Sequence, residues 1–336
     1  MKYYLKPSRI QVYYMNSAAQ TELTPPMTTA RRRALAAFWN GAIDWDADMA
    51  GYCTLRAGGR AEALIKAGTR AELCRLIRWL EDHAVRWRVI GRGSNILVSG
   101  QGFRGVLIVL QGDFCAISRN SGGSVPAAGV VVEAGAGCPM SKLVAWCGRH
   151  GLAGLEFMAG IPGSVGGAVC MNAGAWGRAV GDCLDFVGFV DRGGRSRRVP
   201  RSDLVFSYRR LRPRQAVLND TVITGAGFVL QPGEPGEIQE RGREYLARRR
   251  EKQPAGVASA GSFFRNPAGD SAGRLIEAAG LKGFRSGRAM VSFEHANFIV
   301  NTGQASADEI IELMNEIQKR VFRASGIMLE PEVHLL

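Results

Sequence analysis

The sequence predicts a mixed fold of helices and strands divided between two domains. A chain of 336 residues is long enough to form two hydrophobic cores. From Ala61 onward, short apolar runs typical of buried strands alternate with segments of helical periodicity. The Pro/Gly-rich segment QPGEPGE (231–237) then separates this part from a C-terminal part of different composition. We therefore expect one domain before this linker and a second domain after it.

Local patterns predict the elements of the first domain. Thr69 and Glu72 form a capping box for a helix with apolar residues at helical spacing. Pro139 begins another predicted helix and Gly151 ends it. A further helix is expected after Met27. Apolar runs predict strands at 61–67, 86–91, 105–110, 129–137 and 220–230.

The second domain is predicted to begin with a charged helix at 238–251. A strand is expected at 295–301, and Ser306 with Glu309 caps a later helix. The last ten residues, IMLEPEVHLL, alternate like a final strand. Its apolar face is predicted to be core, whereas the face that carries Glu332 and His334 is either solvent-exposed or part of a site.

Composition limits the class of protein. The net charge of +13 is concentrated at 191–214 and 241–252. Neither segment interleaves aromatic residues for base stacking, so a nucleic-acid-binding protein is the weaker reading, and a phosphate-rich ligand would attract the same charge. Seven cysteines without a CxxC pair favour reduced thiols in a cytoplasm. No run long enough to span a membrane and no signal peptide is found, and no metal-ligand cluster is expected.

Glycine-rich segments carry the first functional signal. The chain has 43 glycines, well above the usual share of about 7%. GRGSN (91–95) follows a predicted strand, and AGIPGSVGGAVCMNAGAWG (159–177) is rich in small residues. Free N–H groups on such turns can bind pyrophosphate. Neither segment matches the GxGxxG or P-loop spacing, but two of them in one domain favour a phosphate-bearing cofactor.

Eight motifs together resemble one enzyme family. In order, they are TLRAGGRA (54–61), GRGSNILV (91–98), GIPGSVGGAVCMNAGA (160–175), FSYR (206–209), GSFFRNP (261–267), GLKG (280–283), HANFIVN (295–301) and LEPEV (329–333). This order resembles the UDP-N-acetylenolpyruvoylglucosamine reductases, from about Phe38 to the last residue. The resemblance implies an α+β fold: a two-lobed FAD-binding domain of the vanillyl-alcohol-oxidase/PCMH type, followed by a C-terminal α+β substrate domain.

The domain boundaries expected on this basis start with a disordered extension at 1–26 and a lead helix and linker at 27–48. The FAD-binding domain would cover 49–230, with lobes at about 49–111 and 112–230. The substrate-binding domain would cover 231–336.

The resemblance also implies an activity. The family reduces UDP-N-acetylglucosamine enolpyruvate to UDP-N-acetylmuramate for peptidoglycan, with non-covalent FAD and with NADPH as reductant. Ser262 of GSFFRNP would be the proton donor. Arg209 of FSYR would hold the substrate carboxylate and stabilise the enolate, with Glu332 of LEPEV beside it. Each of these residues, taken alone, also fits a purely structural role.

The resemblance implies binding residues as well. Tyr208, Lys252 and Asn266 would contact the substrate. The cofactor-binding residues would be Arg56, Gly91, Arg92, Gly93, Ser94, Asn95, Gly160, Ile161, Pro162, Gly163, Ser164, Gly167 and Ala168.

The sequence departs from the family pattern in two ways, and one alternative function stays open. The usual YR-x-S of the family is YRRL here, so the role of that serine is missing. The compact chain lacks the family's inserted subdomain and its tyrosine-bearing lid loop, which puts closure of the site in question. Another FAD oxidase or dehydrogenase on the same fold stays open as an alternative.

Overall fold

The computed structural model describes residues 25–120, 129–213 and 221–336. The extension expected at 1–26 therefore lies almost wholly outside the described residues. The helix expected after Met27 forms at α2 (Thr29–Phe38), where the Thr28 hydroxyl accepts the N–H of Arg31. The Met27 side chain is buried in the hydrophobic core between the first sheet and its helices.

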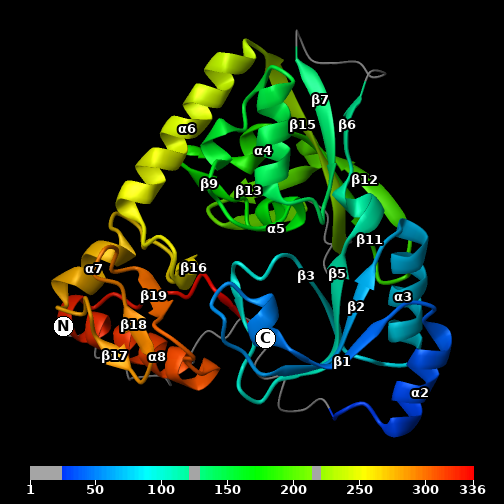
Figure 1. Cartoon of the computed structure of the whole chain (residues 1–336), viewed down its shortest axis with the longest axis horizontal. Coiled ribbons are helices and arrows are strands. Elements are labelled where there is room, and N and C mark those ends of the chain that lie inside the picture. The colour runs from blue at the N-terminus through cyan, green and yellow to red at the C-terminus, as the bar shows by residue number, and fades with distance from the viewer. Residues whose placement is uncertain (1–24, 121–128, 214–220) are drawn as a thin grey trace, which may run out of the picture.

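The first sheet has the strand order β1 (Ile43–Asp48), β2 (Arg60–Ala67), β5 (Phe103–Leu110) and β3 (Trp87–Ile90). Strand β5 pairs in parallel with both β2 and β3. Helices α2 and α3 (Arg70–Asp82) lie along one side of this sheet (Figure 1). The predicted capping box at the start of α3 is present, and the apolar side of α3 is buried in the core beneath it.

The second sheet is antiparallel and has the order β12 (Ser196–Pro200), β11 (Leu184–Val190), β15 (Val222–Pro232), β7 (Val130–Gly135) and β6 (Ile117–Asn120). Short strand β8 (Leu152–Ala153) also pairs with β15. Helices α4 (Met140–Arg149) and α5 (Val165–Cys170) contribute buried residues to the same core as the sheet. The first and second sheets form the two lobes of the N-terminal part.

The C-terminal part has its own sheet, in the order β16 (Ala258–Ser262), β19 (Phe298–Asn301), β18 (Ala289–Val291) and β17 (Arg285–Ser286). Helices α7 (Ala272–Ala278) and α8 (Ala307–Ser325) complete its core. The charged helix expected at 238–251 is α6 (Pro235–Lys252), which runs from the second sheet to the C-terminal part (Figure 1).

The remaining elements are short. They are the 3₁₀ turns η1 (Met49–Tyr52), η2 (Gly112–Cys115), η3 (Glu156–Met158), η4 (Val180–Asp182) and η5 (Arg201–Asp203), and the strands β4 (Ile96–Leu97), β9 (Gly174–Ala175), β10 (Arg178–Ala179), β13 (Leu204–Ser207), β14 (Arg210–Pro213) and β20 (His334–Leu335).

The predicted continuous strand at 327–336 is wrong in its extent. Pro331 forms an isolated bridge with Phe264, and only β20 is a strand, paired in parallel with β4. Proline has no N–H to donate, and the segment changes partner at this point, so no single ladder forms. The expected alternation nevertheless holds, because Leu329 and Val333 are buried.

The C-terminal part is joined to the first lobe through this segment. The Leu336 N–H donates to the Leu97 carbonyl at 2.9 Å, and the Asn301 side chain donates to the Leu55 carbonyl at 2.9 Å. Leu55 and Leu97 belong to the C-terminal core. In the described ranges, no helix has both the length and the apolar character that a membrane crossing needs. The exact domain boundaries stay a prediction.

Candidate active site

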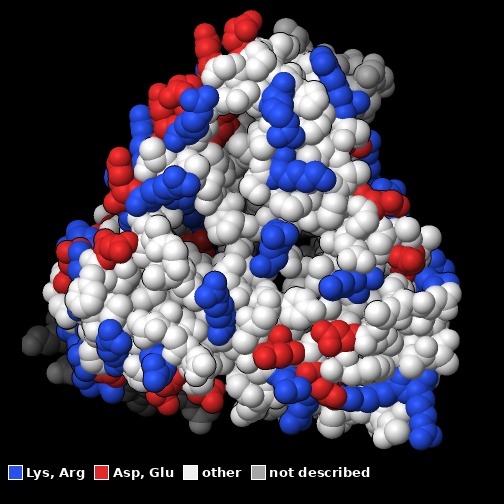
Figure 2. Space-filling model, in the orientation of Figure 1, with Lys and Arg blue, Asp and Glu red and all other residues white. Residues whose placement is uncertain are grey.

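A large cavity lies where the two lobes meet the C-terminal part. Its volume is about 1610 Å³, above the roughly 300–1,000 Å³ of a pocket for a drug-sized ligand. Residues from the GRGSN loop (91–95), the AGIPGS loop (159–164), β16 and the C-terminal segment line it. In Figure 2, basic side chains surround a hollow between the upper and lower parts of the molecule. The cavity is large enough for a dinucleotide together with a second ligand.

The two glycine-rich loops form one continuous wall of the cavity. The Ser94 hydroxyl donates to the Pro162 carbonyl at 3.2 Å. A Cβ on Gly91 would lie 2.6 Å from the Ser164 hydroxyl, and one on Gly163 would lie 3.0 Å from the Ser94 hydroxyl. Side chains at these two positions would press on the serine hydroxyls, so the glycines let the two loops approach each other closely. Of the thirteen residues expected at the cofactor, eleven line this cavity.

The GRGSN loop presents free backbone donors. Gly93 has φ +68°, and a Cβ there would lie 1.8 Å from the Tyr52 carbonyl oxygen, so only glycine fits. Its own carbonyl accepts the Thr54 N–H at 3.0 Å, which fixes the loop. Within the described residues, the N–H groups of Arg92, Gly93 and Ser94 have no acceptor. Such a row of N–H groups fits the phosphates of a dinucleotide.

The AGIPGS loop contributes in a different way. At the start of α5, the N–H groups of Val165 and Gly166 donate to main-chain carbonyls, and that of Gly167 donates to the Ser164 hydroxyl. These donors are therefore already used. A second anion nest would therefore depend on the N–H groups of Gly163 and Ser164, which have no acceptor among the described residues. The loop also supplies a wall of small side chains.

Arg209 and Glu332 meet inside the cavity. Arg209 closes the two-residue turn between β13 and β14 with φ +55°. Its Nε lies 2.8 Å from Glu332 Oε1, a distance that defines an ion pair, although the N–H is not aligned for a hydrogen bond. Glu332 Oε2 has no hydrogen-bond partner among the described residues. The pair therefore keeps a carboxylate oxygen and guanidinium N–H groups available for a ligand.

The electrostatics around Glu332 act in opposite directions. Burial raises the pKa of Glu332 above its ordinary value, while the positive charges of Arg209 and Arg265 lower it. Arg265 also lies near His334. Burial is the largest cause that lowers the pKa of His334, and the positive charges of Arg265 and Arg88 lower it further. His334 is thus held as a neutral imidazole near neutral pH, with Nε2 at 3.1 Å from the sulfur of Met171.

Ser262 is brought to the cavity by a bulge. The pairing of β16 with β19 shifts register between Ser259 and Ser262, and Gly261 has φ +76°. Phe263 and Phe264 are 0% and 1% exposed. They anchor the segment in the core, as their positions beside Ser262 indicated. Ser262 lines the cavity, and its hydroxyl forms no hydrogen bond with another described residue.

Two sets of hydrogen bonds fix the segment that follows Ser262. The Glu332 N–H donates to the Phe263 carbonyl at 2.8 Å, so the residue after Ser262 pairs with Glu332. The Asn297 side chain accepts the Phe264 N–H at 2.9 Å and donates to the Phe264 carbonyl at 2.8 Å. Asn297 is 3% exposed. The HANFIVN motif therefore holds the GSFFRNP motif in register.

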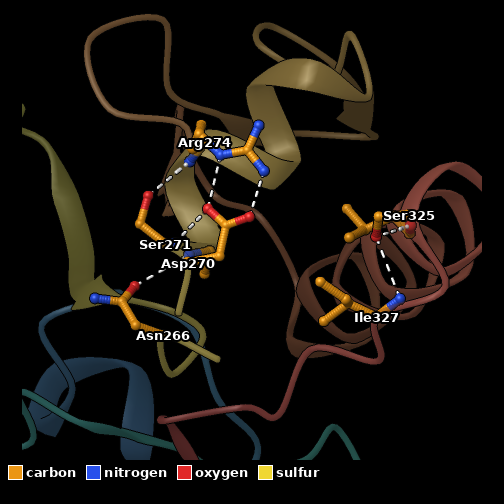
Figure 3. A network of polar contacts seen from close by, with 8 residues as sticks. Asn266, Asp270, Ser271, Arg274, Ser325 and Ile327 are labelled. Atoms are coloured by element: carbon orange, nitrogen blue, oxygen red, sulfur yellow. Dashed lines mark hydrogen bonds and ion pairs between the residues drawn. The ribbon is translucent and has the colours of Figure 1, made fainter. Parts of the chain in front are cut away.

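Several expected site residues do not line the cavity. Tyr208 is 54% exposed, in the turn beside Arg209. Asn266 lies by the start of α7, where its Oδ1 accepts the Ala272 N–H at 3.0 Å (Figure 3). Arg56, an exposed residue with φ +50°, and Gly160 are also outside the lining. Lys252 is at the edge, with Nζ 5.8 Å from the centre of the Trp176 ring. Their binding roles stay predictions.

Other residues of the lining were not expected. Arg249 and Gln253 from the end of α6 line the cavity. In the sequence, Arg249 lies within the run RRREK (248–252), where nothing distinguishes one arginine from the next. His334 also lines the cavity, on the face that the sequence left open between solvent and a site. Among the described residues, no cluster of His, Cys, Asp and Glu could hold a metal ion.

Comparison with known proteins identifies both parts of the chain. Residues 61–199 match the family model for an FAD binding domain. Residues 253–336 match the model for the C-terminal domain of UDP-N-acetylenolpyruvoylglucosamine reductase. The fold prediction, an α+β FAD-binding domain followed by a C-terminal α+β domain, is confirmed.

Full-length relatives agree with these matches. A UDP-N-acetylenolpyruvoylglucosamine reductase of Syntrophus aciditrophicus is 40% identical over 88% of this chain and 93% of the relative. One of Alkalilimnicola ehrlichii is 44% identical over 86% and 92%. The crystal structure of the Thermus caldophilus reductase is similar at a TM-score of 0.72, with 36% identity, over 88% of this chain and 98% of that one.

Proposed function

The chain belongs to the UDP-N-acetylenolpyruvoylglucosamine reductase family, and from this premise we propose that Arg209, Ser262 and Glu332 form its catalytic centre. The protein is an FAD-dependent oxidoreductase that reduces UDP-N-acetylglucosamine enolpyruvate to UDP-N-acetylmuramate with NADPH, for peptidoglycan precursor synthesis. The observation that carries the catalytic proposal is that these three side chains, distant in sequence, line one cavity.

The cavity fits FAD. The free N–H groups of the GRGSN loop suit its diphosphate, and the small residues of the AGIPGS loop allow a flat ring to approach the backbone. When bound, FAD supplies the hydride that it takes from NADPH. No covalent attachment is proposed.

The protein's own residues then act on the substrate. Reduction adds a hydride to the methylene carbon of the enolpyruvyl group and a proton to the adjacent carbon. Arg209 holds the carboxylate and stabilises the negative charge that spreads into it. Ser262 gives the proton to the adjacent carbon. Glu332 keeps Arg209 oriented through the 2.8 Å ion pair.

We assign the binding of the UDP-sugar to the edge of the same cavity. Lys252 at the edge supports this assignment, because its ammonium group offers a charge to an anionic ligand. Tyr208 and Asn266 would have to reach the substrate from outside the present lining, which requires movement of the β13–β14 turn or of the segment before α7.

A cytoplasmic location is part of the proposal. All seven cysteines lie in described residues and none is paired, which suits a reducing compartment. The location also suits a nucleotide-linked substrate and NADPH.

Two measurements test the function. The purified protein should show the absorption spectrum of bound flavin, or acquire it when FAD is added. NADPH oxidation should then depend on UDP-N-acetylglucosamine enolpyruvate. A colourless protein that takes up no FAD, or a flavoprotein whose NADPH oxidation ignores this substrate, would contradict the assignment.

A further inference from the structure

The C-terminal end of α6 brings a second arginine into the cavity. Arg249 is partly buried and lines the cavity with Arg209. Its Nε donates to the Ala159 carbonyl at 3.3 Å, and its Nη1 donates to the Gln253 side-chain oxygen at 3.2 Å. Both acceptors are neutral. The guanidinium is therefore held in place while its other donors remain available.

The contact between α6 and the AGIPGS loop depends on a glycine. Gly160 has φ +77°, and a Cβ there would lie 2.9 Å from Arg249 Cδ and 2.8 Å from Leu246 Cδ1. A side chain at this position would be strained at this φ and would displace the Leu246 and Arg249 side chains. Gly160, although outside the lining, thus allows Arg249 to pack against the loop that borders the cavity.

The charge of Arg249 is not compensated by the protein. In the part of the chain that the structure describes, no carboxylate pairs with it, whereas Arg209 already has Glu332. Burial, followed by the like charge of Arg209, lowers the pKa of Arg249. A partly buried guanidinium beside another one is unfavourable unless an anion neutralises it. Of Arg209 and Arg249, only Arg209 therefore has a carboxylate partner among the described residues.

A helix-end role does not account for this placement. Basic residues near the C-terminus of a helix interact favourably with its dipole, and Arg250 and Lys252 already lie there. Arg250 is exposed, while Arg249 is turned onto the loop and the cavity. The inward position is what a ligand contact requires.

We infer that Arg249 is an anion-binding residue of the substrate site, which contacts an anionic group of the UDP-sugar alongside Arg209. The inference rests on the proposed function and adds to it a residue that the family motifs did not indicate. The anion is either the diphosphate or the enolpyruvyl carboxylate of the substrate, both of which offer oxygen acceptors to a guanidinium.

The test compares Arg249→Gln with Arg250→Gln, its exposed neighbour on the same helix, as FAD-loaded enzymes. Binding of UDP-N-acetylglucosamine and of its enolpyruvyl ether is measured by titration of the flavin spectrum. The affinity of Arg249→Gln for the enolpyruvyl ether should fall about 10- to 100-fold, as for other lost hydrogen bonds to charged groups. Arg250→Gln should bind as the wild type does. Arg249→Lys should recover part of the affinity and of its dependence on salt.

The two ligands identify the anion. An equal loss for both assigns Arg249 to the diphosphate, and a loss for the enolpyruvyl ether alone assigns it to the carboxylate. Affinities equal to those of Arg250→Gln would overturn the inference, as would loss of FAD by the Arg249 variants alone. A wild-type enzyme that does not use the enolpyruvyl ether would instead contradict the proposed function.

Discussion

Replacement of Ser262 by alanine should slow one half-reaction and leave the fold intact. Ser262 lines the cavity and its hydroxyl has no hydrogen-bond partner among the described residues, so loss of this oxygen breaks no internal hydrogen bond. The main-chain pairing of Ser262 with Phe298 and the burial of Phe263 and Phe264 do not involve this oxygen. The free energy of unfolding should therefore change by no more than about 0.5 kcal/mol.

The chemical effect should be much larger. A general acid typically contributes about 10²- to 10⁴-fold in rate, which is roughly 3–5 kcal/mol of barrier at about 1.4 kcal/mol per tenfold. Stopped-flow absorbance separates the two steps. Bleaching of the flavin by NADPH should keep its wild-type rate in Ser262→Ala, whereas reoxidation by the enolpyruvyl substrate should fall by the factor above.

Two further variants sharpen this experiment. Ser262→Cys should recover part of the rate, because a thiol can still donate a proton. Ser259→Ala is the matched control, since Ser259 lies on the same strand outside the cavity lining. Reoxidation of Ser262→Ala at nearly the wild-type rate would refute the proton-donor role. An equal slowing of both half-reactions, with a lower melting temperature, would show instead that Ser262 only supports the turn.

Three other predictions follow from particular contacts. In Gly93→Ala, the new Cβ would lie 1.8 Å from the Tyr52 carbonyl oxygen, at a residue with φ +68°. FAD binding should therefore be lost, and the flavin content of the purified protein measures this loss. Full flavin content would contradict the role of the GRGSN loop in binding FAD. Asn297→Ala leaves the N–H and the carbonyl of Phe264 unpaired in the core. The free energy of unfolding, measured with urea, should fall by about 2–6 kcal/mol, at about 1–3 kcal/mol for each group. A smaller fall would mean that other groups replace the two hydrogen bonds. Arg265→Gln removes a positive charge that lowers the pKa of Glu332, so this pKa should rise and the acidic limb of substrate-driven reoxidation should move to higher pH. If the acidic limb does not move, the ionisation of Glu332 does not control substrate-driven reoxidation.

Much of the fold was readable from the sequence because local patterns determine local elements. The capping boxes of α3 and α8 depend on residues three apart in the chain, and both were predicted at the observed positions. The apolar alternation at the C-terminus likewise gave the right buried residues, Leu329 and Val333. The extent of the predicted strand was wrong, because the segment changes its pairing partner. Pro331 pairs with Phe264, whereas β20 pairs with β4.

The site residues were found through motifs, which mark positions without showing contacts. The sequence by itself determined that Gly93, Ser262 and Glu332 were candidates, because their types and neighbours match a chemistry and a family. Only the tertiary structure decided that Arg209 pairs with Glu332, that Asn266 bonds to the start of α7, and that Arg249 faces the cavity. These outcomes depend on residues tens to hundreds of positions apart, and on which side of a helix or turn meets another element. Spacing along the chain carries no record of that packing.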